Sequence, residues 1–168
     1  AWKWNYGYQA LTRVNQMLEI LDEGIPGLSE EDAIKWEAEL RFLRGFVHQD
    51  MMNVYGDIPL VTSVLSPEEA AELGRTPKEE VFAAIMEDMQ FAAANLETTP
   101  NRGQIGRPTK QTAMGYMGRY YLYEGMFAEA AQMLGNVIAM EGDPVTLDPD
   151  YESLFNGTNE ASPEIMFS

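Results

Sequence analysis

The sequence predicts an all-α protein: antiparallel helix pairs of the tetratricopeptide-like (α-α superhelix) type, connected by long loops. Three observations support this fold class. Apolar residues recur at three- and four-residue steps along most of the chain, helix-start signals precede these runs, and glycine or proline follows them. With 168 residues, of which 45% are hydrophobic, the chain can bury the core that such helices require.

The first helix pair is expected over residues 3–55. One apolar stripe starts at Trp4 and ends before Gly24 and Pro26, which stop the helix. A second stripe begins after Ser29, whose side chain can cap the N-terminus of the next helix. Because both stripes have the period of a helix, we expect two long helices joined by a short turn.

Short elements are expected in the middle of the chain. Pro59 lacks an N–H group and disfavours helix at the residue before it, which predicts an extended run over 58–61. Proline follows serine at 66–67 and threonine at 76–77, a pattern that starts helices, and Gly74 ends the first of them early. The prolines and glycines within 97–108 predict a loop.

Helices are expected across 76–142, and the segment 114–142 within them resembles one tetratricopeptide unit. Such a repeat has a glycine where its two helices approach closely, a tyrosine three residues later, a glycine in the turn and a small residue where the helices cross. These helix pairs stack side by side, because one pair cannot bury its own apolar faces. The matching residues are Gly118, Tyr121, Gly125 and Ala130.

The acidic composition narrows the classes of function. The 11 basic and 27 acidic side chains give a formal net charge of −16, so nucleic acids and anionic lipid surfaces are excluded as partners. The chain has no cysteine, and no motif indicates a metal site or another cofactor. No apolar stretch approaches the length of a transmembrane helix. Since no start methionine or leader precedes Trp2, and 164–168 has the pattern of a strand beginning, the chain is expected to be a trimmed fragment.

Candidate catalytic groups are few. His48 is the only histidine and lacks the partner residues of the common metal sites, so it is expected to be a partly exposed helix residue near Asp50. Acidic pairs in predicted first helical turns, such as Glu68 and Glu69, complement the positive helix N-terminus. Two carboxylates facing each other across a cleft could hydrolyse glycosides, so a helical glycoside hydrolase stays open as a less favoured alternative.

Aromatic residues near the start of the chain are candidates for sugar binding. Trp2 and Trp4 are two residues apart and cannot both join one helix stripe, which leaves Trp2 pointing elsewhere. Aromatic rings stack on the C–H faces of sugars and side-chain amides bind hydroxyls, so Trp2 and Asn5 form a candidate glycan contact. The alternative is that both tryptophans anchor the first helix. A row of tyrosines in the repeat is expected to pack on the neighbouring helix, namely Tyr116, Tyr120 and Tyr123.

Several phrases of the sequence, taken together and in order, resemble one protein family. They match that family's "EARFLRA" helix, "YGDVPLV" turn, "RTPKEEVY" helix start, "RATKGAA" segment and "EIIF" phrase. The corresponding residues are 39–46, 55–61, 75–81, 107–113 and 164–167. These phrases are similar to those of the SusD/RagB family, the outer-membrane nutrient-binding lipoproteins of Bacteroidetes. The resemblance covers 1–168 as part of one SusD/RagB-like helical domain.

The residues in the first two of these phrases are expected to be structural. Arg41 belongs to the helix phrase, and Tyr55 and Pro59 belong to the turn phrase. Gly56 permits a positive φ in this turn, and Asp57 can accept hydrogen bonds from nearby backbone N–H groups. The turn is therefore interpreted as architecture and not as a ligand site.

The resemblance implies non-catalytic, cell-surface binding of glycans, either oligosaccharide or polysaccharide, for delivery to a SusC-like TonB-dependent outer-membrane transporter. It also implies a surface-exposed lipoprotein of the outer membrane, attached only through a lipid anchor that is absent from this chain. The alternative from another class is a tetratricopeptide-type adaptor that binds a peptide or a protein in its concave groove.

Overall fold

The computed structural model describes residues 2–99, 104, 106–142, 145–157, 159 and 162–167. Within these residues the fold is all-helical and contains no strand, which confirms the predicted fold class. The loop expected over 97–108 lies partly outside the described residues. The elements are α1 (Trp2–Glu23), α2 (Glu30–Tyr55), α3 (Pro67–Glu72), α4 (Lys78–Asn95), α5 (Lys110–Tyr123), α6 (Phe127–Ile138) and a 3₁₀ turn, η2 (Tyr151–Leu154).

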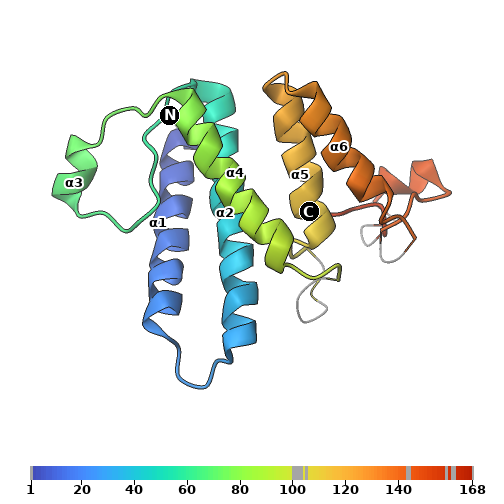
Figure 1. The fold of residues 1–168 in the computed structure, drawn as a ribbon, viewed down its shortest axis with the longest axis horizontal. Coiled ribbons are helices and arrows are strands. Elements are labelled where there is room, and N and C mark those ends of the chain that lie inside the picture. Colours follow the sequence, from blue (N-terminus) through green and yellow to red (C-terminus); the bar gives the residue numbers. More distant parts are fainter. Residues whose placement is uncertain are drawn as a thin grey trace. The chain divides into compact units, whose positions relative to one another are not determined.

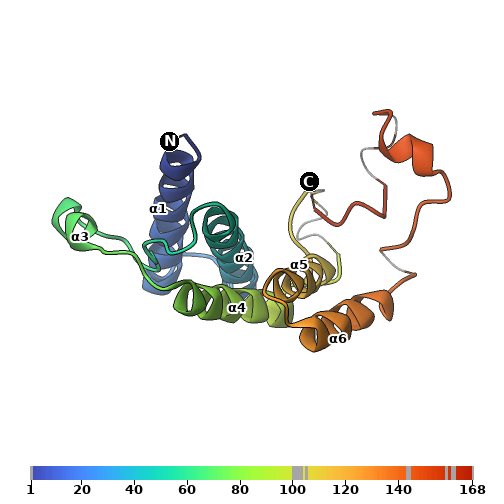
Figure 2. The ribbon, with the colours of Figure 1, turned by 90° about the horizontal axis from the view of Figure 1, so that it is seen from above.

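The chain divides into two compact units, Ala1–Ala92 and Ala93–Ser168. In the first unit, α1 and α2 lie side by side and antiparallel, and α4 crosses α2 (Figure 1). The short helix α3 stands on a loop on the side of α1 away from α2, as both views show (Figures 1 and 2). The core between these helices is apolar, and its fully buried members include Leu11, Phe42, Met51, Met52, Ile58, Val81, Ile85 and Met89.

Local signals account for both ends of α2. The Ser29 side chain accepts a hydrogen bond from the Asp32 N–H at 3.1 Å and so caps the N-terminus. At the other end Gly56 has a φ of 68° and donates its N–H to the Met52 carbonyl. A residue with a Cβ is strained at this positive φ, so glycine is the residue that ends the helix here.

The turn after α2 connects this helix to α4. Asp57 Oδ1 accepts a hydrogen bond from the Lys78 N–H at 3.0 Å, so it caps a helix that starts 21 residues later. Ile58 forms an isolated antiparallel bridge with Thr76, whose N–H donates to the Ile58 carbonyl at 2.9 Å. The two ends of the 59–75 arm are therefore held together at its base.

In the second unit, α5 and α6 form an antiparallel pair of the tetratricopeptide type (Figure 1). A Cβ on Gly118 would lie 2.6 Å from Leu134 Cγ, so the close approach of the two helices requires glycine. Gly125 has a φ of 73° in the turn between the helices, and Ala130 is buried. Tyr121 contributes its carbonyl, which accepts the Met126 N–H at 2.9 Å.

The closing segment of the chain is not a strand, so the expectation of a strand starting at 164 is wrong over the described residues 164–167. A strand needs a neighbouring backbone to pair with, and this segment packs against α5 instead. The Thr112 hydroxyl donates to the Met166 carbonyl at 2.6 Å, and the Met166 side chain covers Gly115. The Phe167 ring meets the Tyr116 ring at 6.2 Å between centroids.

Candidate functional site

A groove of about 540 Å³ lies beside the N-terminal half of α1, within the first unit. One wall consists of α1 side chains, and the other consists of residues of the 59–75 arm, including one residue of α3. The lining combines aromatic rings, amides, hydroxyls and aliphatic groups. Its members are Trp4, Asn5, Tyr8, Gln9, Thr12, Pro59, Val61, Ser63, Val64, Leu65, Ala70 and Leu73.

The period of the helix explains which α1 residues reach the groove. Residues four apart lie above one another on a helix, so Trp4, Tyr8 and Thr12 form one row. Asn5 and Gln9 form the neighbouring row by the same spacing. The groove wall on α1 is therefore an aromatic row flanked on one side by an amide row, while Leu11, on the other side of the aromatic row, is buried in the core.

The aromatic row is held rigidly. The Trp4 ring packs on Tyr8 at 4.9 Å between centroids and edge-on against Tyr55 at 5.1 Å. The Tyr8 hydroxyl donates to the Pro59 carbonyl at 3.0 Å, which ties α1 to the base of the arm. Burial raises the pKa of this hydroxyl well above its usual value, and the nearby Arg75 charge opposes the shift only in part. Tyr8 therefore remains a neutral donor.

The structure separates the two residues that the sequence pairs as a glycan contact. Asn5 lines the groove, whereas Trp2 lies outside the lining residues and is 73% exposed. The Trp2 ring meets Tyr6 edge-on at 6.1 Å, so the pair forms an exposed aromatic surface on the next face of α1. Trp4, in contrast, is packed between the rings of Tyr8 and Tyr55.

Sequence reasoning missed the groove residues beyond Asn5. The apolar stripe that starts at Trp4 includes Tyr8 by its four-residue spacing, whereas Gln9 and Thr12 received no role. The spacing of Asn5 and Gln9 beside the aromatic row was the available signal, because i, i+4 amides next to i, i+4 rings give a helix face that is both aromatic and polar. The opposite wall carries no such signal, since the arm reaches α1 only through the fold.

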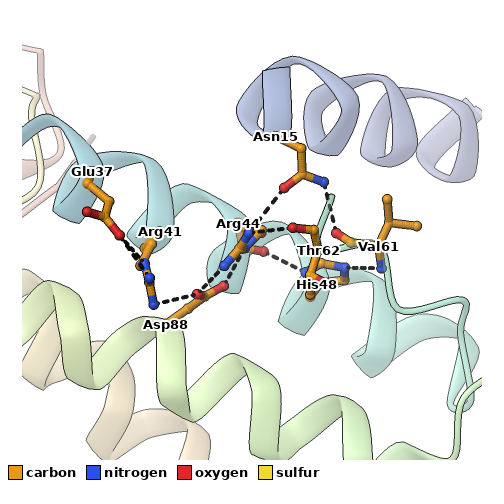
Figure 3. A network of polar contacts seen from close by, with 8 residues as sticks. All are labelled: Asn15, Glu37, Arg41, Arg44, His48, Val61, Thr62 and Asp88. Carbon is orange, nitrogen blue, oxygen red and sulfur yellow. Dashed lines mark hydrogen bonds and ion pairs between the residues drawn. The ribbon is translucent and has the colours of Figure 1, made fainter. Parts of the chain in front are cut away.

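A buried polar network holds the base of the arm against the helices (Figure 3). The Arg44 guanidinium binds Asp88 with two hydrogen bonds of 2.7 Å each, one from Nε and one from Nη2. Its remaining Nη1 group donates to the Thr62 carbonyl at 2.9 Å and to Asn15 Oδ1 at 3.2 Å. The side chains of Arg44 and Asp88 are only 11% and 6% exposed. This arginine thereby connects α2 to α4, α1 and the arm.

Asn15 completes the attachment of the arm to α1. Its Nδ2 group donates to the Val61 carbonyl (Figure 3) and also to the Ser63 carbonyl, each at 3.1 Å. Both residues line the groove, so the network fixes the backbone of one groove wall. Arg41 lies one helical turn away, paired with Glu37 at 2.8 Å and stacked 4.1 Å from the centre of the Phe91 ring.

His48 is part of this scaffold, and the expectation that it is a partly exposed residue near Asp50 is wrong. It is 1% exposed, and its Nδ1–H donates to the Arg44 carbonyl at 3.0 Å. Its Nε2 accepts the Val61 N–H at 3.3 Å, which requires the neutral ring. Burial lowers the pKa of His48 to about 4, and the Arg44 charge adds to the shift while the backbone hydrogen bond opposes it.

The neutral His48 makes stability depend on pH. Below pH 6.5 the unfolded chain protonates this histidine but the folded protein does not, so the free energy of unfolding falls as the pH drops towards 4. The expected loss is about 3 kcal/mol, since one pKa unit corresponds to about 1.4 kcal/mol. Urea unfolding of the wild type and of His48→Gln between pH 7.5 and 4 measures it. The free energy of unfolding of the glutamine variant should therefore fall less steeply with decreasing pH than that of the wild type. If the two proteins lose stability in parallel, His48 is not the group responsible.

The tyrosine row of α5 contributes mostly to packing. Tyr120 is buried, and its ring meets Tyr116 at 5.7 Å between centroids. Tyr123 is exposed at the end of the helix beside Arg119. Among the residues that the structure describes, no three acidic, histidine or cysteine side chains gather in a way that could hold a metal ion. None of the described helices is long and apolar enough to cross a membrane.

The comparison with protein families decides where this chain belongs. The model of a SusD-like family, described as "Starch-binding associating with outer membrane", matches residues 1–122. The chain belongs to the SusD-like family. Among curated SusD-like proteins, P25 and P2 of Formosa agariphila are 28% and 30% identical to it over 165 and 162 residues. The two matches include 98% and 94% of this SusD-like chain, but the chain spans only 31% of the length of each relative.

Solved structures agree with this assignment. A laminarin-binding SusD-like protein superposes with a TM-score of 0.89 at 26% identity, covering 98% of this chain and 36% of its own. A SusD-like carbohydrate-binding protein from Bacteroides fragilis gives a TM-score of 0.85 at 25% identity, with 98% and 32% coverage. The SusD-like chain described here therefore corresponds to about a third of these proteins.

Proposed function

We propose that this SusD-like protein binds glycans at the cell surface without catalysis and delivers them to a SusC-like TonB-dependent outer-membrane transporter. We place it on the outer membrane, attached by a lipid anchor that lies outside these 168 residues. The observation that carries the proposal is the exposed N-terminal face of α1, where free aromatic surface adjoins an amide-lined groove. That face occurs in a chain whose family is described as starch-binding.

The chemistry of this face suits sugars. The exposed Trp2 ring offers a flat apolar surface for the C–H face of a pyranose, and the Asn5 amide can both donate to and accept from hydroxyls. Stacking and a few hydrogen bonds in water give a weak site, with a Kd in the millimolar to micromolar range, or about −4 to −8 kcal/mol. Weak binding is compatible with delivery, because a carrier must release what it captures.

Replacement of Trp2 by alanine tests the proposal. The protein as encoded in its gene is run through native gels that each contain one polysaccharide. Laminarin is included because one of the structurally similar proteins is a laminarin-binding SusD-like protein. We expect one or more glycans to retard the wild type, and Trp2→Ala to weaken that binding about tenfold, because the stacking surface is lost. Asn5→Ala should weaken it as well through the loss of hydroxyl contacts.

A matched control shows whether an effect of Trp2→Ala comes from the loss of a specific binding contact or from the removal of any exposed aromatic ring. Phe127 on α6 is 68% exposed, similar to Trp2, and lies outside the groove. Phe127→Ala should therefore migrate like the wild type in every gel. Equal retardation of wild type and Trp2→Ala would overturn the placement of the site, and release of reducing sugar would overturn the non-catalytic assignment in favour of a glycoside hydrolase.

Peptide or protein binding by the α5–α6 pair is a second candidate function, and one observation favours it. Phe127 and Ile138 are both exposed and, about three helical turns apart, lie on the same side of α6. An adaptor that uses this face would lose its partner in Phe127→Ala while Trp2→Ala kept it. The two candidate functions thus predict opposite effects for the same two variants.

A further inference from the structure

We propose that the groove beside α1 takes neutral glycan chains and rejects those that carry carboxylate or sulfate groups. The inference rests on the proposed function, since it names the class of glycan for the same site. Two independent features of the structure carry it: the composition of the groove lining, and the charge of the arm that forms one of its walls.

None of the described residues that line the groove carries a charged side chain. The groups that face the cavity are the Trp4 and Tyr8 rings, the amides of Asn5 and Gln9, hydroxyl groups, and aliphatic side chains from the arm. Amides and hydroxyls match sugar hydroxyls in both donor and acceptor roles. An anionic substituent entering this space would lose its hydration and find no lysine or arginine to pair with, which is unfavourable.

The arm that forms the outer wall is acidic. Ala70 of α3 and Leu73, which directly follows this helix, line the groove, and α3 carries the exposed residues Glu68, Glu69 and Glu72. Hydrogen bonds from Ser66 to the Glu69 carboxylate lower the pKa of Glu69, so that it stays ionised. Three carboxylates on this wall, in a chain of net charge −16, repel an approaching polyanion.

Three cations lie near this region: Lys3, Arg75, and Arg13, which follows Gln9 by one turn along α1. Lys3 pairs with Asp50 at 2.7 Å. Arg75 is close enough to act on Tyr8, but it is not a lining residue and its Nη1 donates to the Asp57 carbonyl at 3.3 Å. Because a carbonyl does not neutralise a guanidinium, Arg75 could oppose the proposed selectivity. Arg13, which is exposed and also outside the lining residues, could do the same. The test therefore includes both.

Pairs of neutral and anionic polysaccharides with the same or a closely related backbone test the inference. Native gels contain laminarin or sulfated laminarin, hydroxyethylcellulose or carboxymethylcellulose, and agarose or κ-carrageenan, each with serum albumin as an acidic reference protein. For the backbone that binds, we expect the protein as encoded to bind the neutral form at least tenfold more tightly at low salt. The preference should shrink as salt is raised, since screening weakens the repulsion.

A charge placed in the groove should reverse the preference. Gln9→Lys puts a cation in the amide row and should strengthen binding of the sulfated or carboxylated form at least tenfold. Gln132→Lys makes the same charge change on α6, outside the groove lining, and should leave the neutral preference unchanged. An equal gain in both variants would overturn the assignment of selectivity to this groove.

The possible failures are distinguishable. Tighter binding of an anionic form by the wild type, lost in Arg13→Gln or in Arg75→Gln, would overturn the selectivity and leave glycan binding intact. Binding of no polysaccharide, neutral or anionic, would remove the proposed function and the inference together. Gln9→Trp places a bulky side chain in the amide row. If neutral polysaccharides retard this variant as strongly as the wild type, the groove is not the binding site and the inference is overturned.

Discussion

Replacement of Asp88 by asparagine is expected to lower the free energy of unfolding by about 3–5 kcal/mol, the cost of leaving one partner of a buried ion pair unpaired. The Arg44 guanidinium, 11% exposed, would keep its charge and lose the carboxylate that it binds at 2.7 Å through two nitrogens. Urea or thermal unfolding of the wild type and the variant, followed by circular dichroism, measures the change.

Asp50 provides the matched control for this substitution. It pairs with Lys3 at the same distance of 2.7 Å, but the two side chains are 32% and 51% exposed. Exposed pairs contribute about 0–1 kcal/mol, so Asp50→Asn should have little effect. Equal losses in the two variants would contradict the assignment of the Arg44–Asp88 pair as the central attachment of the arm.

The same network connects stability to the groove. Arg44 and Asn15 fix the backbone at 61–63 through three hydrogen bonds to carbonyls, and two of these residues line the groove. If the arm became disordered, the groove would lose one of its two walls. Weaker glycan binding in Asp88→Asn, under conditions where the variant remains folded, is therefore the expected functional consequence.

Replacement of Gly118 by valine is expected to lower the free energy of unfolding by about 3 kcal/mol through overpacking. The new Cβ would lie 2.6 Å from Leu134 Cγ and Cδ2, and the Leu134 backbone nitrogen stands 3.5 Å away, so α5 and α6 must separate or Leu134 must move. Thermal unfolding measures the loss. A stability equal to that of the wild type would show that the helices do not approach as closely as described.

Gly135 and Leu134 supply the controls for this result. A Cβ at Gly135, on α6, meets nothing within 4 Å, so Gly135→Val should change stability by less than about 0.5 kcal/mol. Truncation of the opposing side chain in Gly118→Val with Leu134→Ala should recover part of the loss. The coupling free energy of this double-mutant cycle is expected to be about 1–3 kcal/mol.

The helices were predictable because their signals are local. The apolar spacing that begins at Trp4, the Ser29 cap and Gly56 act within a few residues, and helix formation depends on neighbours in sequence. Gly118 was also predictable, since a repeat pattern places the close approach at a fixed offset. The strand expected at 164–168 failed because a strand depends on a partner that the local pattern does not specify.

Residues whose roles depend on distant partners were not predictable in the same way. His48 was predicted to be a partly exposed helix residue, but its Nε2 accepts a hydrogen bond from the Val61 N–H and so helps to hold the arm. Asp57 was expected to bond nearby backbone, and its partner is the N–H of Lys78, 21 residues later. Such pairs join segments that only folding brings together.

The all-helical fold, the repeat-like pair at 114–142 and the family resemblance could all be inferred from spacing along the chain, and the family comparison confirms the resemblance. The position of the groove, in contrast, depends on contacts between distant segments. Its α1 wall has a pattern in sequence, but its other wall is an arm held by Arg44, Asn15 and Asp57 across gaps of 18 to 48 residues. A site made of two walls exists only once those long-range hydrogen bonds have formed.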